Sequence, residues 1–573
     1  MTTSRSKFNR MIRNLTGVGI FVLTLFLYLL TRYPSVAYID SGELAVVNGT
    51  LGIAHPTGYP LYTILGRLFA LLPLELMTTQ VMFGALCTAV TAAVLFFTFV
   101  RYFDRHEPAP ISVLAMLTLL FASAPLIWGQ GTTNEVYSLH LLFISLILAL
   151  LLSPLDTRRR VMGPFVVALA FGNHMSTILL LPAIAVHLYS QRALIARTKR
   201  IIPLSLSAVV VGASLYLYLP VRAALDPIFN WGQPHTWENF VRHVTGWQYQ
   251  VWMFSKSPGE LAGNLWDFAQ IFYEQFPALF WLPVALGIIT AWRRHRHLAM
   301  LLSCFLVFNC LYALNFSIPD IDNYLLPSVV ALFGFGCLGV WWLIERLRVS
   351  AGIAAGAVAA LVVWGLMLNW QEYDQSRNHA PLDGVHNLYA SAETDALIFC
   401  ADWDIVSPWL YSHFALGERS DVILIDNELA RRSWYFDWIR HVDARLYEHA
   451  QPEIEAFLPQ VRKFERNEPY DPQQIETAYQ RMLMKFLQYR ARPLYIDQSA
   501  NLSFPPPGEI LVSGQLLRIV RDGEAAAERK IVLREPRFGK PGDALNVRER
   551  FNLEKYERMV RAASDVPDSN SAR

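Results

Sequence analysis

The first residues whose types and spacing suit chemistry form the run Asp40-Ser-Gly-Glu43, which follows an apolar stretch near residues 16–32. A carboxylate just outside a membrane is well placed to take a proton from a hydroxyl group as a general base. In a helix, Asp40 and Glu43 would share one face at i, i+3 spacing. The same residues also fit a capping box, with Asp40 as the N-cap and Glu43 in the first turn. Both interpretations stay open, and one aspartate could serve in both.

A second run, His-Pro-Thr-Gly-Tyr-Pro from His55 to Pro60, places a histidine and a tyrosine between two prolines and a glycine. Prolines and glycines in such a pattern form a rigid turn. The turn could present His55 and Tyr59 to a phosphate group or a sugar. It could equally be only the elbow between two helices at the membrane surface.

Two more polar groups are expected at the outer ends of membrane helices. The first contains Asn134, Glu135 and Tyr137. Because Asn is a good N-cap and Glu suits the first turn of a helix, capping is the favoured interpretation for Asn134. The second, Asn173 and His174, interrupts a long apolar run. An ionisable side chain there is costly unless it faces a cavity or a partner, so we predict a functional role for His174.

Four residues further along the chain are also candidates for binding. Arg222 follows an apolar stretch and could hold a lipid phosphate through a two-pronged, charge-assisted contact, although a snorkelling arginine is the alternative. Trp231 lies in an outer segment rich in Trp and Tyr, which favour the headgroup level. Asp320 and Asp322 form an Asp-x-Asp pattern that resembles a metal-binding motif. A helix cap is the favoured interpretation of this pair, and we predict no metal site.

Charge and hydropathy divide the chain that must position these residues. Of 573 residues 53% are hydrophobic, yet 58 of the 96 charged residues follow Trp370. This asymmetry predicts a membrane domain over residues 1–369 and a soluble domain over residues 370–573. A net charge of +2 without a long basic run argues against a nucleic-acid partner. Five cysteines, four of them in apolar runs, predict no disulfide framework.

Apolar stretches long enough for a bilayer predict about eleven membrane helices. They lie near residues 16–32, 80–100, 110–127, 137–153, 201–219, 275–292, 298–316, 324–344 and 351–369, with two shorter ones between Arg160 and Gln191 that meet at Gly172-Asn173-His174. With eleven spans, all linkers rich in Arg and Lys fall on one side, as the positive-inside rule requires. The candidate residues and the C-terminal domain then share the opposite side.

Short elements outside the bilayer complete the prediction. Residues 41–53 and 61–72 are expected to form two helices in the first outer loop. In the C-terminal part, strands near Asp395–Ala401, Asp421–Asp426 and Pro493–Asp497 alternate with helical stretches at 405–416, 427–450 and 472–490. Strands alternating with helices predict an α/β domain.

Taken in order, these motifs resemble the transmembrane protein 260-like branch of the GT-C glycosyltransferases, once a domain of unknown function. The resemblance covers about residues 20–330 and rests on six runs that occur in register. They are Asp-Ser-Gly-Glu, His-Pro-Thr-Gly-Tyr-Pro, Asn-Glu-Val-Tyr-Ser, Gly-Asn-His, Leu-Pro-Val-Arg with Asn-Trp-Gly, and Asp-Ile-Asp-Asn-Tyr-Leu-Leu-Pro-Ser. The resemblance implies a GT-C fold, a polyprenyl-phosphate sugar as donor substrate and no other cofactor.

The eukaryotic relative in that branch is a protein O-mannosyltransferase, so the resemblance implies transfer of a sugar, mannose, to a protein Ser or Thr. Asp40 matches the first-loop acid that such enzymes use as base, and Glu43 would assist it. The partners expected are the lipid-linked donor, a protein or glycan acceptor, and the bilayer. We expect a bacterial inner membrane with the site facing the periplasm. A cell-envelope glycan or glycolipid acceptor, a transporter and a non-catalytic assembly subunit are the alternatives.

Overall fold

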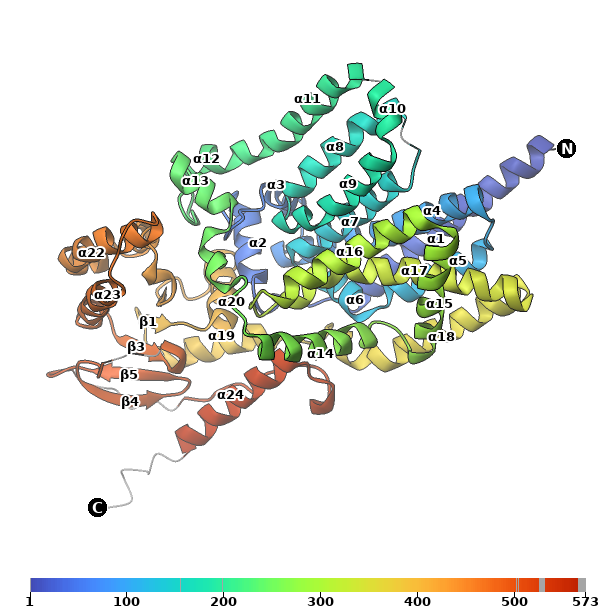
Figure 1. The fold of residues 1–573 in the computed structure, drawn as a ribbon. Helices are drawn as coiled ribbons and strands as arrows, with labels where there is room; N and C mark the ends of the chain where they lie inside the picture. The colour runs from blue at the N-terminus through green and yellow to red at the C-terminus, as the bar shows by residue number, and fades with distance from the viewer. Residues whose placement is uncertain are drawn as a thin grey trace.

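The computed structural model describes residues 2–564 except 155, 198, 501, 503 and 525–530. Figure 1 shows a helical bundle with the C-terminal domain at one end and the N-terminus at the opposite end. This arrangement agrees with a membrane domain followed by an α/β domain. It also places the loops that carry the candidate residues beside the C-terminal domain.

The helical part runs from α1 to α18. Its elements are α1 (Thr2–Leu30), α2 (Ser41–Thr50), α3 (Pro60–Ala70), α4 (Leu76–His106), α5 (Ile111–Ala122), α6 (Pro125–Thr132), α7 (Val136–Leu151), α8 (Thr157–Phe171), η1 (Met175–Leu180), α9 (Leu181–Ser190), α10 (Arg192–Arg197), η2 (Lys199–Ile201), α11 (Ile202–Ala213), η3 (Ser214–Leu217), α12 (Tyr218–Ala223), α13 (Trp237–Val244), η4 (Trp247–Trp252), α14 (Pro258–Glu274), η5 (Ala278–Phe280), α15 (Trp281–Arg294), α16 (Arg296–Leu314), η6 (Ile321–Leu325), α17 (Leu326–Leu347) and α18 (Ala351–Tyr373).

The C-terminal domain contains the remaining elements. They are α19 (Ala380–Ser391), β1 (Leu397–Cys400), α20 (Trp403–Phe414), β2 (Ile423–Asp426), η7 (Leu429–Arg431), α21 (Tyr435–Val442), α22 (Ala444–Glu465), α23 (Pro472–Leu487), β3 (Leu494–Asp497), η8 (Gln498–Ala500), β4 (Glu509–Ser513), β5 (Leu516–Val520), η9 (Gly542–Ala544) and α24 (Val547–Ser564).

The membrane domain is confirmed, but its helices are less regular than expected. In the described part of the chain, six helices are long and apolar enough to cross a membrane, or up to eight if each of two bent pairs is one span. Two shorter apolar helices cover Val136–Leu151 and Met175–Ser190. By these criteria the described part of the chain has fewer long spans than the total of about eleven, two of them short, that the sequence predicts.

Two expected spans belong to the bent pairs. The stretch 110–127 is bent by 68° between α5 and α6, where Pro125 begins a new helix. A proline lacks the N–H that a continuous helix would need at this point. The stretch 275–292 begins only at Ala278 and lies at 100° to α14, which precedes it. In contrast, the expected break at Gly172-Asn173-His174 is confirmed, because α8 ends at Phe171 and η1 begins at Met175.

Close helix packing in the bundle depends on small residues. A Cβ atom on Gly287 of α15 would lie 1.7 Å from the carbonyl oxygen of Phe335 on α17, and one on Gly339 of α17 would lie 1.7 Å from that of Pro283. Glycines at these positions let the two backbones touch, as is common in membrane helix pairs. We therefore expect α15 and α17 to form a rigid support for the loops at their ends.

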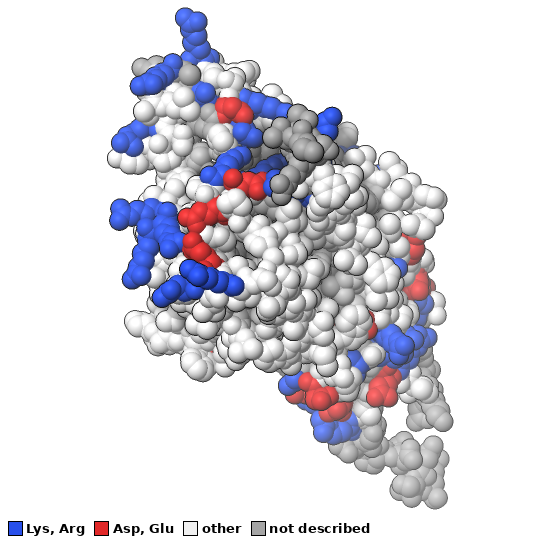
Figure 2. Space-filling view, turned by 90° about the vertical axis from the view of Figure 1, so that its right-hand side faces the viewer, with Lys and Arg blue, Asp and Glu red and all other residues white. Residues whose placement is uncertain are grey.

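The basic linkers lie together at the end of the bundle that carries the N-terminus. Arg13 of α1 forms an ion pair with Asp104 of α4, and Arg294 contacts both Glu345 at 2.9 Å and Glu107 at 4.0 Å. Figure 2 views this end and shows many Lys and Arg side chains along its left edge beside a broad uncharged surface, with a second group of mixed charge at the lower right. This grouping is what the positive-inside argument predicted.

The C-terminal domain is built on a five-stranded sheet with the order β2-β1-β3-β5-β4. Strands β2, β1 and β3 are parallel, whereas β5 and β4 form an antiparallel extension. The three parallel strands match the three expected from sequence, and the hairpin β4–β5 was not expected. Parallel strands are joined by helices, so their carboxyl ends meet at one edge, and the helix α20 leaves that edge towards the membrane domain.

Candidate active site

A carboxylate–histidine cluster forms where α2 begins in the first outer loop. Nδ1 of His55 lies 2.7 Å from Oε2 of Glu43, and the backbone N–H of His55 donates to Oε1 of Glu43 at 2.8 Å. On its other side, Nε2 of His55 lies 2.9 Å from the Tyr59 hydroxyl and 3.7 Å from Oδ2 of Asp40. Glu43 is fully buried, whereas Asp40 keeps part of its surface open to the cavity described below. The turn between α2 and α3 therefore serves to hold His55 between the two carboxylates.

The charged groups in this cluster shift one another's pKa values. Burial opposes a charge on His55, but Glu43 and Asp40 outweigh it and raise the pKa of His55 to about 10. Burial also raises the pKa of Asp40, and Glu43 adds to the rise, whereas His55 and a hydrogen bond from Trp403 oppose it. A base works best when its pKa lies near the operating pH. The cluster thus combines a cationic imidazole with a carboxylate whose proton affinity is increased.

Ligand atoms of Asp40, Glu43 and His55 all lie within 4.8 Å of one another, a spacing that could also hold a metal ion. A metal needs a neutral imidazole as ligand, whereas the two carboxylates favour the protonated ring. The absence of a metal at this site stays a prediction.

Residues of the C-terminal domain complete the cluster. The indole N–H of Trp403, at the start of α20, donates to Oδ1 of Asp40 at 2.7 Å. The Ser407 hydroxyl accepts from the backbone N–H groups of Gly42 and Glu43, both at 3.2 Å. A Cβ atom on Gly42 would lie 1.9 Å from the carbonyl oxygen of Ser407, so only glycine allows this contact. The soluble domain is therefore docked directly on the candidate base.

These contacts show whether Asp40 caps α2 with its side chain. Asp40 stands at the N-cap position of α2, but its side chain makes no capping hydrogen bond. Ser407 satisfies the free N–H groups instead, and Glu43 is engaged by His55. The capping-box interpretation is wrong, because Ser407 accepts the N–H bond that Asp40 would accept, and the Glu43 carboxylate is engaged by His55.

Replacing Trp403 with Phe is expected to shift the pKa of Asp40 and to slow the expected sugar transfer without abolishing it. The substitution deletes a hydrogen bond to a charged group, which contributes on the order of 1.5–3 kcal/mol. Because that bond lowers the pKa of Asp40, its loss should raise this pKa and move the acid limb of the pH–rate profile to higher pH. We expect kcat for the expected sugar transfer to fall about tenfold, measured from initial rates at a series of pH values. The matched control is Trp438→Phe in α21.

The indole nitrogen of Trp438 has no hydrogen-bond partner among the described residues, so this control has no such bond to lose. It should leave the pH–rate profile unchanged. A Trp403→Phe protein with the wild-type profile would contradict the assigned role.

A cavity of about 500 Å³ opens beside the cluster, between the outer loops and the C-terminal domain. Seven of the residues predicted for the site line it, namely Asp40, His55, Tyr59, Tyr137, His174, Trp231 and Asp320. The Tyr137 hydroxyl donates to Asp320 at 2.6 Å, and the His174 ring stacks on Tyr59 at 5.8 Å between centroids. Side chains 115 and 183 positions apart in the sequence thus meet in one polar wall.

The other predicted residues support the cavity from behind or lie outside its lining. Asn134 donates to the carbonyl of Ser41 at 3.0 Å, and Asn173 donates to that of Val136 at 3.2 Å, so each ties loops together. Glu135, rather than Asn134, is the N-cap residue of α7. Asp322 lies on η6 outside the lining.

Arg222 is also outside the cavity. Its Nε donates to the carbonyl of Leu51 at 2.7 Å and its Nη2 to that of Thr50 at 3.2 Å. Both carbonyls lie at the end of α2, where a helix leaves such groups unpaired. The guanidinium is thus used to cap α2, and it is not available in this arrangement for a phosphate in the cavity.

Sequence analysis missed the cavity residues from the C-terminal domain. Trp403, Glu428, Arg432 and Arg548 all line it. Arg548 forms an ion pair with Asp404 at 2.6 Å, whereas Arg432 pairs with no acidic side chain among the described residues. One signal was available, because Trp403 comes just after the strand β1 and loops at the carboxyl ends of parallel strands are common ligand sites.

The raised pKa of His55 also predicts how stability depends on pH. The protonated ring is favoured in the folded state, so its contribution is fully present below the unfolded value of about 6.5. It is lost as the pH rises through about 10. We expect the thermal unfolding midpoint to fall between pH 7 and pH 10 in wild type, measured by fluorescence in detergent. In His55→Asn the decline should be much weaker; an equal decline in both proteins would contradict the assignment.

The fold and the site define a polytopic membrane protein in which a soluble α/β domain closes over a carboxylate–histidine cavity. The family model for the protein O-mannosyl-transferase TMEM260 N-terminal domain matches residues 40–195. Mouse protein O-mannosyl-transferase TMEM260 is 26% identical over 458 residues, which are 73% of this chain and 63% of the relative. The Dictyostelium discoideum protein of the same name is 22% identical over 484 residues, 73% of this chain and 58% of the relative. These matches confirm the resemblance to the TMEM260 proteins.

The matched region spans only about 60% of the length of these two relatives. Two crystal structures of ArnT from Cupriavidus metallidurans are also similar. The one bound to undecaprenyl phosphate is 12% identical, with a TM-score of 0.47, and covers 90% of this chain and 99% of that one. The apo structure is 13% identical, with a TM-score of 0.48, and covers 88% and 97%.

Proposed function

We propose that the protein is a membrane glycosyltransferase that moves mannose from a polyprenyl-phosphate donor to a Ser or Thr hydroxyl of a protein. The observation that carries the proposal is the position of Asp40. It is a carboxylate with a raised pKa, it lines a cavity at the edge of the membrane domain, and it is held by hydrogen bonding and charge from both domains. The names of the similar proteins in mouse and Dictyostelium support mannose and a protein acceptor.

The lining of the cavity combines two kinds of surface that suit such a donor. Apolar side chains come from η1 and from the residues that follow η4 and α16, among them Met175, Ile178, Leu179, Met253 and Phe316. A polyprenyl chain fits an apolar wall of this kind. The lining also includes Arg432, whose guanidinium pairs with no acidic side chain among the described residues and is suited to the phosphate. In this proposal Arg432 takes the role that sequence analysis gave to Arg222.

The mechanism we propose is a single inverting displacement. Asp40 accepts the proton of the acceptor hydroxyl while the new oxygen–carbon bond forms at the anomeric carbon. The bond from that carbon to the phosphate oxygen breaks, and polyprenyl phosphate leaves with the electron pair. His55, held cationic by Glu43, and Arg432 would stabilise the negative charge around the reacting centre. We propose no metal and no further cofactor.

The location is part of the same proposal. The basic linkers at the N-terminal end would face the cytoplasm, and the cavity and C-terminal domain would face the periplasm of a bacterial inner membrane. A cysteine-accessibility experiment tests this orientation. A single cysteine on the exposed helix α23 should react with a membrane-impermeant reagent in intact spheroplasts, and one in the linker before α5 should not.

The experiment that tests the proposed activity compares two donors. Purified protein is incubated with a peptide mixture and either labelled polyprenyl-phosphate mannose or labelled nucleotide-activated mannose. Label should reach peptide only from the lipid-linked donor, with release of polyprenyl phosphate. Transfer from the nucleotide sugar alone would overturn the donor assignment, and label in a glycan or glycolipid alone would overturn the acceptor assignment.

A further inference from the structure

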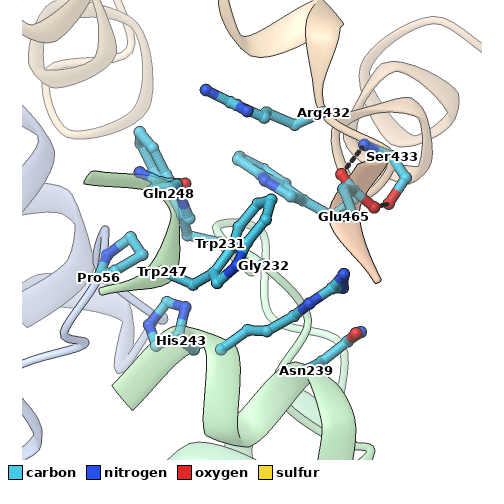
Figure 3. A pocket seen from close by; sticks show the side chains of 12 residues that line it. Pro56, Trp231, Gly232, Asn239, His243, Trp247, Gln248, Arg432, Ser433 and Glu465 are labelled. Atoms are coloured by element: carbon cyan, nitrogen blue, oxygen red, sulfur yellow. Dashed lines mark hydrogen bonds between the residues drawn. The ribbon is translucent and has the colours of Figure 1, made fainter. Parts of the chain in front are cut away.

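A second cleft adjoins the catalytic cavity between α13, η4 and the C-terminal domain (Figure 3). It shares Pro56, Trp231, Gln248 and Arg432 with that cavity, so the two spaces are neighbours. Trp231 lies between the two spaces. Its ring centroid is 5.9 Å from that of His55, which lines the cavity, and 5.1 Å from that of Trp434, which lines the cleft. A molecule that reaches Asp40 through the cleft would therefore pass this tryptophan.

The cleft is rich in hydrogen-bond donors that lack partners. Nη2 of Arg242 and Nε1 of Trp231 are buried, and neither has a hydrogen-bond partner among the described residues. Arg242 reaches an acidic group only at 3.7 Å, in Glu238, and Glu238 also faces Arg466 at 3.3 Å. An unpaired buried donor is costly, so these groups favour a ligand that supplies acceptors.

The acidic group in the same cleft is already engaged. Glu465, the one carboxylate in its described lining, accepts from the backbone N–H of Ser433 at 3.0 Å and from its hydroxyl at 2.6 Å (Figure 3). The ring of Trp247 lies against the Arg242 guanidinium at 5.3 Å and provides a flat apolar wall. The side chains that line the cleft thus offer more positive charge and free hydrogen-bond donors than free carboxylates. Aromatic rings beside them provide a surface on which an extended chain can lie.

We infer that this cleft binds the polypeptide that flanks the acceptor hydroxyl, and that Arg242 selects a carboxylate side chain on it. The inference rests on the proposed function. Backbone carbonyls would satisfy donors such as Trp231, and an Asp or Glu of the acceptor would accept a charge-assisted hydrogen bond from Nη2 of Arg242, which has no partner among the described residues. A route past Trp231 would then deliver the Ser or Thr hydroxyl to Asp40.

The test uses peptides with one acceptor Thr and a single Glu, Gln or Lys at successive positions on either side. Wild type should show a lower KM for Glu than for Gln at one position. Arg242→Gln should raise the KM of that Glu peptide about tenfold and leave the donor Kd unchanged. Arg242→Glu should reverse the preference and favour the Lys peptide. Arg481→Gln, an exposed arginine on α23 of the C-terminal domain, is the matched control and should behave as wild type.

The outcomes separate the inference from the proposed function. A Glu preference that survives in both Arg242 variants, or no preference in wild type, would overturn the inference while leaving peptide transfer intact. Label that reaches only a glycan or a lipid, and never a peptide, would overturn the protein acceptor and with it the inference. The charge reversal with Arg242→Glu is the supporting result, because a variant that merely failed to fold would lose both peptides alike.

Discussion

Replacing Asp40 with Asn is expected to lower the rate of sugar transfer by about 10²–10⁴-fold, the range that a positioned general base contributes. Asparagine keeps the size of the side chain and an oxygen for the Trp403 indole, which donates at 2.7 Å. It cannot accept the proton of the acceptor hydroxyl. The measurement is the initial rate of label transfer from polyprenyl-phosphate mannose to peptide.

The control for this variant is Asp267→Asn. Asp267 is an exposed carboxylate on α14, outside the cavity lining. Its replacement should leave transfer unchanged. Binding of the donor to the Asp40→Asn protein should persist, because the variant loses the proton acceptor and not the binding surface. Equal transfer by the Asp40→Asn protein and wild type would remove Asp40 from the mechanism.

Replacing Glu43 with Gln is expected to have the second largest effect, on stability as well as activity. Glu43 is fully buried and holds His55 through two contacts, at 2.7 and 2.8 Å. Breaking a buried ion pair by removing one partner costs about 3–5 kcal/mol. Without Glu43 the pKa of His55 should fall, so the ring would lose its charge near neutral pH and no longer stabilise the Asp40 carboxylate. Unfolding transitions and pH–rate profiles measure the two effects.

A double-mutant cycle separates this effect from simple loss of packing. Glu43→Gln and His55→Asn should each destabilise the protein, and the double variant should lose much less than the sum of the two. Additive losses would show that the two side chains act independently. That outcome would also contradict the raised pKa of His55 as the origin of the pH-dependent stability.

Local patterns in the sequence predicted much of the fold, because each depends on nearby residues. The apolar stretches predicted the helical bundle, and the break at Gly172-Asn173-His174 was placed correctly. The three short apolar runs near Leu397, Ile423 and Leu494 predicted the parallel strands. The bend between α5 and α6 was missed because hydropathy does not show where a helix breaks. The stretch is apolar throughout, yet the helix is broken just before Pro125.

The cavity was predicted only in part. Asp40, His55 and His174 were found because polar residues beside apolar runs are unusual and the topology places them on one side. Trp403 was missed because its contact with Asp40 joins residues 363 positions apart, and nothing local shows which surface of the C-terminal domain meets the membrane domain. Arg222 was assigned to phosphate for a similar reason, since its carbonyl partners at the end of α2 become visible only in the folded chain.

In the proposed function, this chain transfers a sugar from a lipid phosphate with Asp40 as the base. The most direct measurement follows both products in a single incubation of purified wild type and Asp40→Asn with doubly labelled polyprenyl-phosphate mannose and an acceptor peptide. We expect wild type to form mannosyl peptide and polyprenyl phosphate in equal amounts and the variant to form neither at a comparable rate. Mannosyl peptide formed equally by both proteins, or polyprenyl phosphate released without any sugar transferred, would contradict the account.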